Sequence, residues 1–435
     1  MNSFIYTGLL RVTSPIVFRL LERKARRAGG VWEIRAPERF GHYAQLGSST
    51  SPFANSAAPV WVHAVSLGET RAAQPLIQTL LDQGLPVLLT HMTATGRAMG
   101  SSFFEQYIAS GQLQQAWIPY DLPEAVKGFL GHWQPRCGIL IEREIWPNLL
   151  AEAKTQEIPM VVVSARFSES ALKQSRWMGK VLKEAFASLQ LVLAQTPEDE
   201  KRLKDYGLNQ VELAGNIKFD VTVAESLIEE AQVFKEKLQR PVVLIASTRD
   251  GEEAMFLEAI SQISSSATES ATKPLYVLVP RHPQRFEEVR TLLDKSGLSY
   301  LRRSQQASAD ELRECSFLLG DSVGELFFYY GLADVAIIGG SFESFGGQNN
   351  IEASAAGVPV IVGPHTANFK QAVEDAIEVG ATLRVESAAE AVRKAEQLLN
   401  NPQERAAMSL AAQQWMSQHR GATERTMDYL QPFLT

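Results

Sequence analysis

The sequence predicts an α/β protein built from two doubly wound, Rossmann-like domains that face each other across a central cleft. The first observation is that short β-rich runs alternate with stretches of helical periodicity, which is the pattern of a parallel sheet built from βαβ units. The second is that a glycine-containing turn after a strand, leading into a helix, occurs twice, at residues 66–69 and at residues 339–352. With 435 residues, 45% of them hydrophobic, the chain can bury two cores.

The candidate strands fall into two groups separated by a junction at residues 215–220 and the charged helix that follows it. A serine-rich segment at residues 261–272 is expected to be a surface loop inside the second group. The first group lies at residues 60–65, 86–90, 115–118, 137–141, 159–163 and 189–194, and the second at 241–246, 275–279, 316–319, 335–338 and 358–362.

Charge and cysteine content exclude several classes of function. The 42 Lys and Arg residues are outnumbered by 49 Asp and Glu residues, and the net charge of -7 argues against nucleic acid as the main partner. The two cysteines, Cys137 and Cys315, are far apart and have no C-x-x-C spacing, so neither a zinc site nor a disulfide framework is expected. Sparse cysteine use fits a reducing, cytoplasmic compartment.

The amino terminus differs from the rest of the chain. Residues 1–21 are largely apolar but are interrupted by Arg11, Pro15 and Arg19, which makes them a poor spanning helix, and no signal-peptide cleavage site follows. A basic cluster comes directly after them. An apolar face beside basic residues favours a helix that lies on an anionic membrane surface, and the alternative is a solvated helix that caps the first domain. The basic residues are Arg23, Lys24, Arg26, Arg27, Arg35 and Arg39.

Glu69 is the first candidate functional residue. It opens a helix after the strand at residues 60–65, and open α/β sheets bind their ligands at the carboxyl ends of such strands. The alternative is that Glu69 only complements the positive end of the helix macrodipole.

Phosphate recognition is expected without a metal ion. The chain has neither a G-x-x-x-x-G-K-[ST] loop nor a D-x-D pair, so phosphate charge would be met by helix amides, Lys218 and Arg281. The alternative for Arg281 is a surface ion pair. His63 is expected to be a hydrogen-bonded strand histidine, and Trp146 a packing residue.

Taken in order, a set of motifs resembles the Kdo transferases of lipopolysaccharide assembly along nearly the whole chain. The resemblance implies a GT-B glycosyltransferase without cofactor that moves 3-deoxy-manno-octulosonic acid (Kdo) from CMP-Kdo to a tetraacylated lipid A precursor, with inversion at the anomeric carbon. It also implies a location on the cytoplasmic face of the cell inner membrane. The motifs lie at residues 63–69, 119–123, 142–148, 215–220, 251–253, 280–283, 320–326, 339–341 and 363–365.

The same resemblance implies roles for individual residues. Glu69 would be the general base, and Glu142 and Lys218 would stabilise the transition state. The residues that would hold CMP are Pro280, Arg281, Val323, Gly324, Glu325, Asn349, Asn350, Ile351 and Glu352. No residue is expected to bind a metal ion.

The chain departs from the family motifs at several positions. Gln348 and Asn350 stand where the family usually has His and Pro, Arg143 replaces a Thr, and Arg249 and Asp250 replace a His-Glu pair. Two other functions are therefore weighed: a nucleotide-sugar epimerase of the same fold, which would not need a basic amphipathic anchor, and a catalytically silent scaffold.

The expected domain layout follows from these observations. Residues 1–30 form the membrane-associated helix, residues 31–220 the acceptor-binding domain, and residues 221–405 the CMP-Kdo-binding domain. Residues 406–435 form a helical segment that packs back on the amino-terminal domain.

Overall fold

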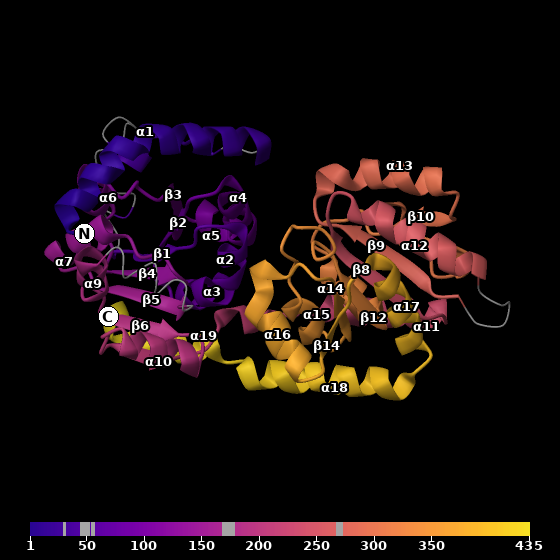
Figure 1. The fold of residues 1–435 in the computed structure, drawn as a ribbon. Coiled ribbons are helices and arrows are strands. Elements are labelled where there is room, and N and C mark those ends of the chain that lie inside the picture. The colour runs from indigo at the N-terminus through magenta and orange to yellow at the C-terminus, as the bar shows by residue number, and fades with distance from the viewer. Residues whose placement is uncertain (29–31, 44–52, 54–56, 168–178, 267–272) are drawn as a thin grey trace. The chain divides into compact units, whose positions relative to one another are not determined.

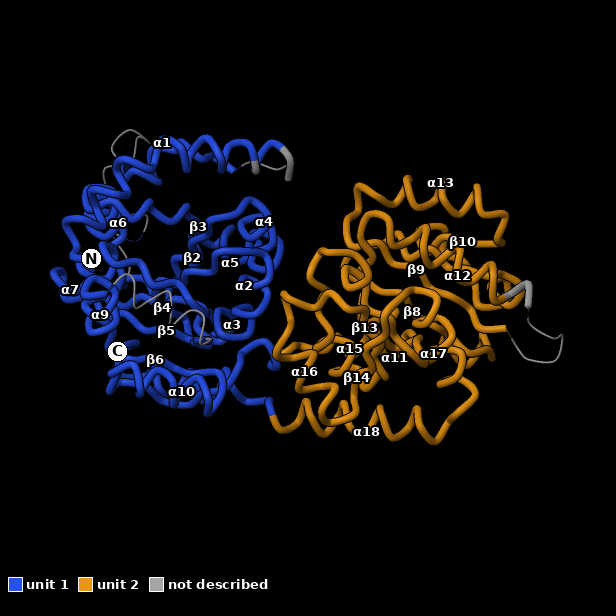
Figure 2. Tube along the Cα trace, viewed as in Figure 1, with its two compact units in different colours: residues 1–220, 419–435 blue, residues 221–418 orange. Residues whose placement is uncertain are grey.

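The chain forms two compact α/β units (Figures 1 and 2). The computed structural model describes residues 1–28, 32–43, 53, 57–167, 179–266 and 273–435. The first unit contains Met1–Asp220 and His419–Thr435, and the second contains Val221–Gln418.

The first unit is built on a parallel sheet of seven strands in the order β3-β2-β1-β4-β5-β6-β7. The strands are β1 (Val60–His63), β2 (Val87–His91), β3 (Leu113–Trp117), β4 (Cys137–Ile141), β5 (Met160–Ala165), β6 (Leu191–Ala194) and β7 (Val211–Leu213). The helices are α1 (Ser3–Ala28), α2 (Leu67–Ala72), α3 (Gln74–Asp82), α4 (Ala94–Phe103), α5 (Glu105–Ala109), α6 (Pro123–Trp133), α7 (Pro147–Thr155), α9 (Lys180–Phe186), α10 (Pro197–Asp205) and α19 (Ala422–Leu434).

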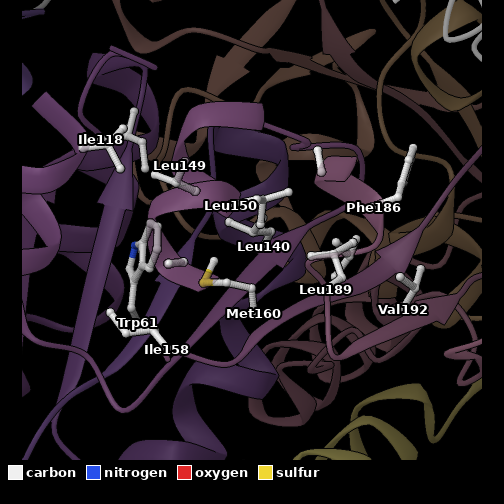
Figure 3. Packing of buried hydrophobic residues seen from close by; sticks show 14 of the residues in the cluster. Trp61, Ile118, Leu140, Leu149, Leu150, Ile158, Met160, Phe186, Leu189 and Val192 are labelled. Atoms are coloured by element: carbon white, nitrogen blue, oxygen red, sulfur yellow. The ribbon is translucent and has the colours of Figure 1, made fainter. Parts of the chain in front are cut away.

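Each face of this sheet carries its own core, because successive side chains of a strand point to opposite faces. Trp61, Leu140 and Met160 belong to one core (Figure 3). Side chains of α6, α7 and α9 are part of the same core. Val60 and Val62 point to the other face, where α3 and the carboxyl-terminal helix α19 cover them. The strands are buried on both sides, as parallel sheets usually are.

The second unit repeats the architecture with the strand order β10-β11-β9-β8-β12-β13-β14. The strands are β8 (Val242–Thr248), β9 (Leu275–Pro280), β10 (Tyr300–Arg302), β11 (Phe317–Leu319), β12 (Val335–Ile338), β13 (Val360–Val362) and β14 (Thr382–Arg384). The helices are α11 (Glu225–Leu238), α12 (Glu252–Ser266), α13 (Phe286–Ser296), α14 (Leu326–Leu332), α15 (Ile351–Ala355), α16 (Lys370–Glu378), α17 (Ala388–Leu399) and α18 (Pro402–His419).

Short 3₁₀ helices connect several of these elements. They are η1 (Pro37–Phe40), η3 (Ile217–Phe219), η4 (Pro283–Arg285), η5 (Arg303–Gln305), η6 (Glu311–Arg313) and η7 (Ala367–Phe369).

Helix α1 is continuous through Pro15 and lies against the first unit along one face. Its Tyr6 hydroxyl donates to Asp121 (2.8 Å), Thr7 donates to Asn148 (3.0 Å), and Phe18 is buried in a small core with Trp117 and other side chains. The opposite face is exposed and apolar. Its side chains follow a helical spacing of three or four residues: Ile5, Leu9, Val12, Ile16 and Leu20. Contrary to the sequence expectation, the segment Ser3–Arg23 is long and apolar enough to cross a membrane by length and composition.

The structure differs from the sequence prediction in four places. Strands β7, β10 and β14 were not predicted. Residues 261–266 of the predicted serine-rich loop form the end of α12, and residues 267–272 lie outside the described part of the chain. The carboxyl-terminal segment returns to the first unit only from His419, because α18 up to Gln418 belongs to the second unit. Gly68 lies in the first turn of α2 rather than in a glycine turn before it.

Candidate active site

The predicted catalytic carboxylates lie at the point in the first sheet where the strand order reverses. From β1 the chain proceeds to β2 on one side, and later returns to β4 on the other side of β1. The helices that follow β1 and β4 therefore pack on opposite faces of the sheet. Open α/β sheets bind their ligands at the carboxyl ends of the strands beside such a point. Glu69 follows β1 and Glu142 follows β4 directly, so the fold brings both residues to this edge of the sheet.

Glu69 is held by its own helix and tuned by its neighbours. The backbone N–H of Ser66 donates to Glu69 Oε2 (2.7 Å), and Ser66 and Glu69 form a capping box at the start of α2. Glu69 therefore also stabilises the start of α2, which is the alternative role stated for it in the sequence analysis. Burial, followed by the negative charges of Glu142 and Glu144, raises the pKa of Glu69 to about 7. The hydrogen bond from Ser66 thus fixes the position of the Glu69 carboxylate, and its surroundings raise its pKa to a value that suits a general base.

Glu142 and Lys218 form an ion pair at the same edge of the sheet. Glu142 has a left-handed backbone (φ 66°), a strained conformation for a residue with a side chain. Lys218 lies in η3, whose N-cap Asn216 accepts the Lys218 backbone N–H (3.0 Å) and lies 3.3 Å from the hydroxyl of Ser164. The pair places the cation of Lys218 beside the carboxylate of Glu142, and a fixed cation suits the stabilisation of developing negative charge.

Glu144 is a third carboxylate of this group, and the sequence analysis gave it no role. The indole N–H of Trp146 donates to Glu144 (2.7 Å), and burial raises the pKa of Glu144. Trp146 also packs against the core, as expected, with its ring edge toward His63. His63 bonds Thr90 through Nδ1 (2.9 Å), and burial lowers its pKa to about 3, so this histidine is a neutral strand residue.

Asp121 fixes the helix that follows the Glu142–Trp146 segment. Its carboxylate accepts the backbone N–H groups of Asn148 (3.2 Å) and Leu149 (2.8 Å) at the start of α7, and the Tyr6 hydroxyl of α1. Burial raises the pKa of Asp121 to about 6.

In the second unit, the strand order reverses between β8 and β12, and the predicted nucleotide residues gather at this edge. Pro280 ends β9, and Arg281 follows it and donates from Nε to Gln348 of the glycine loop (3.2 Å). The loop turns at Gly340, Gly346 and Gly347, which all have positive φ. Gln348, which stands where the family usually has His, therefore contacts Arg281, one of the residues that the resemblance assigns to CMP binding.

Glu252 lies in the motif at residues 251–253, to which the sequence analysis gave no role, and it holds the glycine loop in place. Its fully buried carboxylate accepts the backbone N–H groups of Gly340 (2.6 Å), Phe342 (2.9 Å) and Arg249 (2.8 Å). A carboxylate that accepts several backbone donors rigidifies the loop it binds.

The segment from Asn349 to Glu352 starts α15. Asn349 accepts the backbone N–H of Ile351 (3.0 Å), and the Glu352 side chain lies in the first turn with 4% of the residue exposed. Asn350 is fully buried, and its Oδ1 has no hydrogen-bond partner among the described residues.

The segment from Val323 to Glu325 follows β11, the strand next to β9. Val323 is 74% exposed, and Gly324 turns the chain with a φ of 86°. Glu325 pairs with Arg303 (2.7 Å), and this hydrogen bond holds the pKa of Glu325 below its ordinary value. The carboxylate of Glu325 is thus ion-paired with Arg303, a residue of the same unit.

Among the described residues, no group of three or more His, Cys, Asp or Glu side chains is arranged to hold a metal ion.

Comparison with known proteins identifies the family. A family model described as 3-deoxy-D-manno-octulosonic-acid transferase (kdotransferase) matches residues 34–221, and a model of group 1 glycosyl transferases matches residues 296–415. The chain is 54% identical to 3-deoxy-D-manno-octulosonic acid transferase of Bordetella pertussis over 434 residues, which is 100% of both chains. It is 32% identical to the Haemophilus influenzae transferase, over 99% of this chain and 98% of the other.

A solved structure shows the same fold at low sequence identity. A glycosyltransferase from Rickettsia africae is similar with a TM-score of 0.53 and 13% identity, over 87% of this chain and 98% of that chain. The two seven-stranded units are thus the two Rossmann-like domains of a GT-B glycosyltransferase, as the sequence predicted. The chain belongs to the 3-deoxy-D-manno-octulosonic acid transferases, the glycosyltransferases that transfer Kdo in lipopolysaccharide biosynthesis.

Proposed function

We propose that this enzyme transfers Kdo from CMP-Kdo to a tetraacylated lipid A precursor with inversion, and that Glu69 is the general base. The observation that carries the proposal is the Glu69 carboxylate, which is fixed by Ser66 and has a pKa of about 7 beside Glu142 and Glu144. A base with this pKa is half ionised near neutral pH and can still accept a proton there.

In the proposed reaction, the acceptor hydroxyl gives its proton to Glu69 while its oxygen forms a bond to the anomeric carbon of Kdo. The bond from that carbon to the phosphate oxygen breaks, and CMP leaves with the electron pair. The cation of Lys218, anchored by Glu142, stabilises negative charge that develops during transfer.

The second unit would bind the donor through the carboxyl-terminal edge of its sheet. Arg281 would contact the phosphate, and Glu352 would accept hydrogen bonds from the ribose hydroxyls. The other residues of this proposed CMP site are Pro280, Val323, Gly324, Glu325, Asn349, Asn350 and Ile351. Support comes from the hydrogen bond between Arg281 and Gln348, which joins two of the contributing segments.

The test is a Glu69→Gln variant, assayed for release of CMP and for product mass with CMP-Kdo and tetraacylated lipid A precursor. The expected result is a turnover lowered by ~100-fold or more, with CMP affinity unchanged. Glu105→Gln, an exposed change in the same unit, is the matched control. Near-normal turnover of Glu69→Gln would remove Glu69 from the mechanism.

Folding of the variant can be checked independently. Gln also serves in a capping box, so α2 should form normally. Because the pKa of Glu69 is raised, its ionised form costs stability above that pKa, and the neutral Gln removes this cost. Glu69→Gln should therefore be at least as stable as the wild type at about pH 8.

We propose further that α1 attaches the enzyme to the cytoplasmic face of the inner membrane and lies on the surface without crossing it. Its exposed apolar stripe is accompanied by exposed Arg19, Arg23 and Arg26, which suit an anionic leaflet. The opposite face bonds Asp121 and Asn148 and buries Phe18, and a crossing helix would have to give up these contacts.

A further inference from the structure

Three arginines surround His282 in the second unit. Burial, and then the positive charges of Arg249, Arg281 and Arg285, lower the pKa of His282 to about 4. The neutral imidazole accepts a hydrogen bond at Nε2 from Arg249 Nη1 (2.9 Å). His282 thus serves as an uncharged support for an arginine.

Two of these arginines, Arg285 and Arg249, differ in how their positive charge is compensated. Arg285 pairs with Glu253 (2.6 Å), Glu288 (3.1 Å) and Asp250 (3.4 Å), so its charge is neutralised within the unit. Arg249 forms no ion pair with any described residue. Its contacts are His282 and the ring of Phe345, whose centroid lies 4.6 Å from the guanidinium carbon. Within the described part of the chain, Arg249 is thus a positioned cation without an ion-pair partner.

The position of Arg249 in the fold makes this charge available to a ligand. Arg249 follows β8 directly and Phe345 lies in the loop after β12, and the helices that follow β8 and β12 pack on opposite faces of the sheet. Open α/β sheets bind ligands at such a switch point. The stems of Arg249 and Gln348 both lie against Gly340, where an added Cβ would be 3.4 Å from Arg249 Cγ and 2.8 Å from Gln348 Nε2. Arg249 is therefore next to the residue that bonds Arg281.

We propose that Arg249 binds the carboxylate of the Kdo residue that is being transferred. The inference rests on the proposed function, in which the donor carries two anionic groups, a phosphodiester and the sugar carboxylate. Arg281 is assigned to the phosphodiester, which leaves the carboxylate for Arg249. The planar guanidinium can bond both oxygens of a carboxylate, and its support by His282 and Phe345 orients it in advance.

CMP and CMP-Kdo separate the two anionic groups experimentally, because CMP lacks the sugar carboxylate. Calorimetric titration of CMP and initial rates at varied CMP-Kdo would be measured on the full chain for Arg249→Gln, Arg249→Lys and Arg281→Gln. Arg290→Gln, which removes a partly exposed arginine of α13 that pairs with Glu287, is the control for lost charge.

Arg249→Gln should bind CMP as the wild type does, while its KM for CMP-Kdo rises by about ten- to a hundredfold. The KM of Arg249→Lys for CMP-Kdo should lie between those of the wild type and Arg249→Gln. Lysine keeps the positive charge but lacks the planar guanidinium that can bond both carboxylate oxygens. Arg281→Gln should weaken both ligands. An unchanged KM in Arg249→Gln would overturn the inference, and so would an equal loss of affinity for CMP. A wild-type enzyme that does not bind CMP would instead overturn the proposed function.

Discussion

The pKa of Glu69 illustrates how one residue obtains its chemistry from its surroundings. The carboxylate is buried at the start of α2, and two further carboxylates, Glu142 and Glu144, face it from the segment after β4. Burial and like charge both disfavour the ionised form, so both raise the pKa. The sequence could place Glu69 and Glu142 at strand ends, but the contribution of Glu144 requires the turn of the backbone at Glu142.

A pH dependence follows from this arrangement. Glu69 must be ionised to accept a proton, so kcat/KM should fall as the pH drops through about 7. Glu144→Gln removes one of the negative neighbours, which should lower the pKa of Glu69 and move this limb of the profile to lower pH. Values of kcat/KM measured from about pH 5.5 to about pH 8.5 check both the fall in the wild type and its shift in Glu144→Gln. A limb that stays in place in Glu144→Gln would show that Glu144 does not influence the base.

Glu352 allows a test of the proposed ribose contact. Glu352→Ala removes charge-assisted bonds worth roughly 1.5 to 3 kcal/mol, so the dissociation constant of CMP should rise by about ten- to a hundredfold. Calorimetric titration of CMP measures this. Unaltered affinity would place the nucleotide elsewhere.

Asn350→Pro is the matched variant in the same turn. Asn350 has a φ of -86°, near the range of proline, and its buried Oδ1 has no partner among the described residues, so the loss of this side chain should be tolerated. CMP affinity should change little, because proline is the residue that the family motif usually has at this position.

At the scale of elements, the sequence revealed the central strands of both sheets and missed strands at their edges. Central strands are buried on both faces and therefore form continuous apolar runs. The missed strands β7, β10 and β14 have three residues each and lie at sheet edges, where side chains such as Glu212 and Arg384 remain exposed. The serines at residues 264–266 end a helix because packing of α12 against the sheet outweighs their weak helix propensity.

The link between α1 and α7 through Asp121 can be tested by stability. Asp121→Ala leaves the two backbone N–H groups at the start of α7 and the Tyr6 hydroxyl without their acceptor, at a cost of roughly 1 to 3 kcal/mol per group. Because three groups are affected, the Tm should fall by at least about 6 °C, measured by calorimetry. Asp428→Ala, an exposed change on α19, is the control and should leave the Tm unchanged. Equal Tm values in both variants would contradict the role assigned to Asp121.

At the scale of the whole molecule, motifs that are far apart in the sequence predicted which residues form the candidate site. They could do so because parallel strands place the segments that follow them at the same edge of a sheet. Residues 69, 142 and 218 are far apart in sequence, yet parallel strands deliver them to one edge of one sheet. The partners that tune and support the site, Asp121, Glu144 and Glu252, could not be assigned in this way. Asp121 and Glu252 act through hydrogen bonds to particular backbone atoms, and Glu144 through its charge beside Glu69. A linear pattern does not encode these contacts.

The membrane attachment of α1 gives the last prediction. Ile16 and Leu20 lie on its exposed stripe, away from the face that contacts the first unit, so Ile16→Glu with Leu20→Glu should leave folding and CMP binding intact. The same changes put two negative charges where apolar side chains would enter the leaflet, and binding to vesicles that contain phosphatidylglycerol should fall by about tenfold or more. Leu410→Glu, which changes an exposed leucine of α18, is the matched control and should bind vesicles normally. Binding of the wild type should also weaken with added salt, because the basic residues contribute through screened charge. Cosedimentation with the vesicles decides the matter: if the double variant binds as the wild type does, the membrane surface of this enzyme does not include α1.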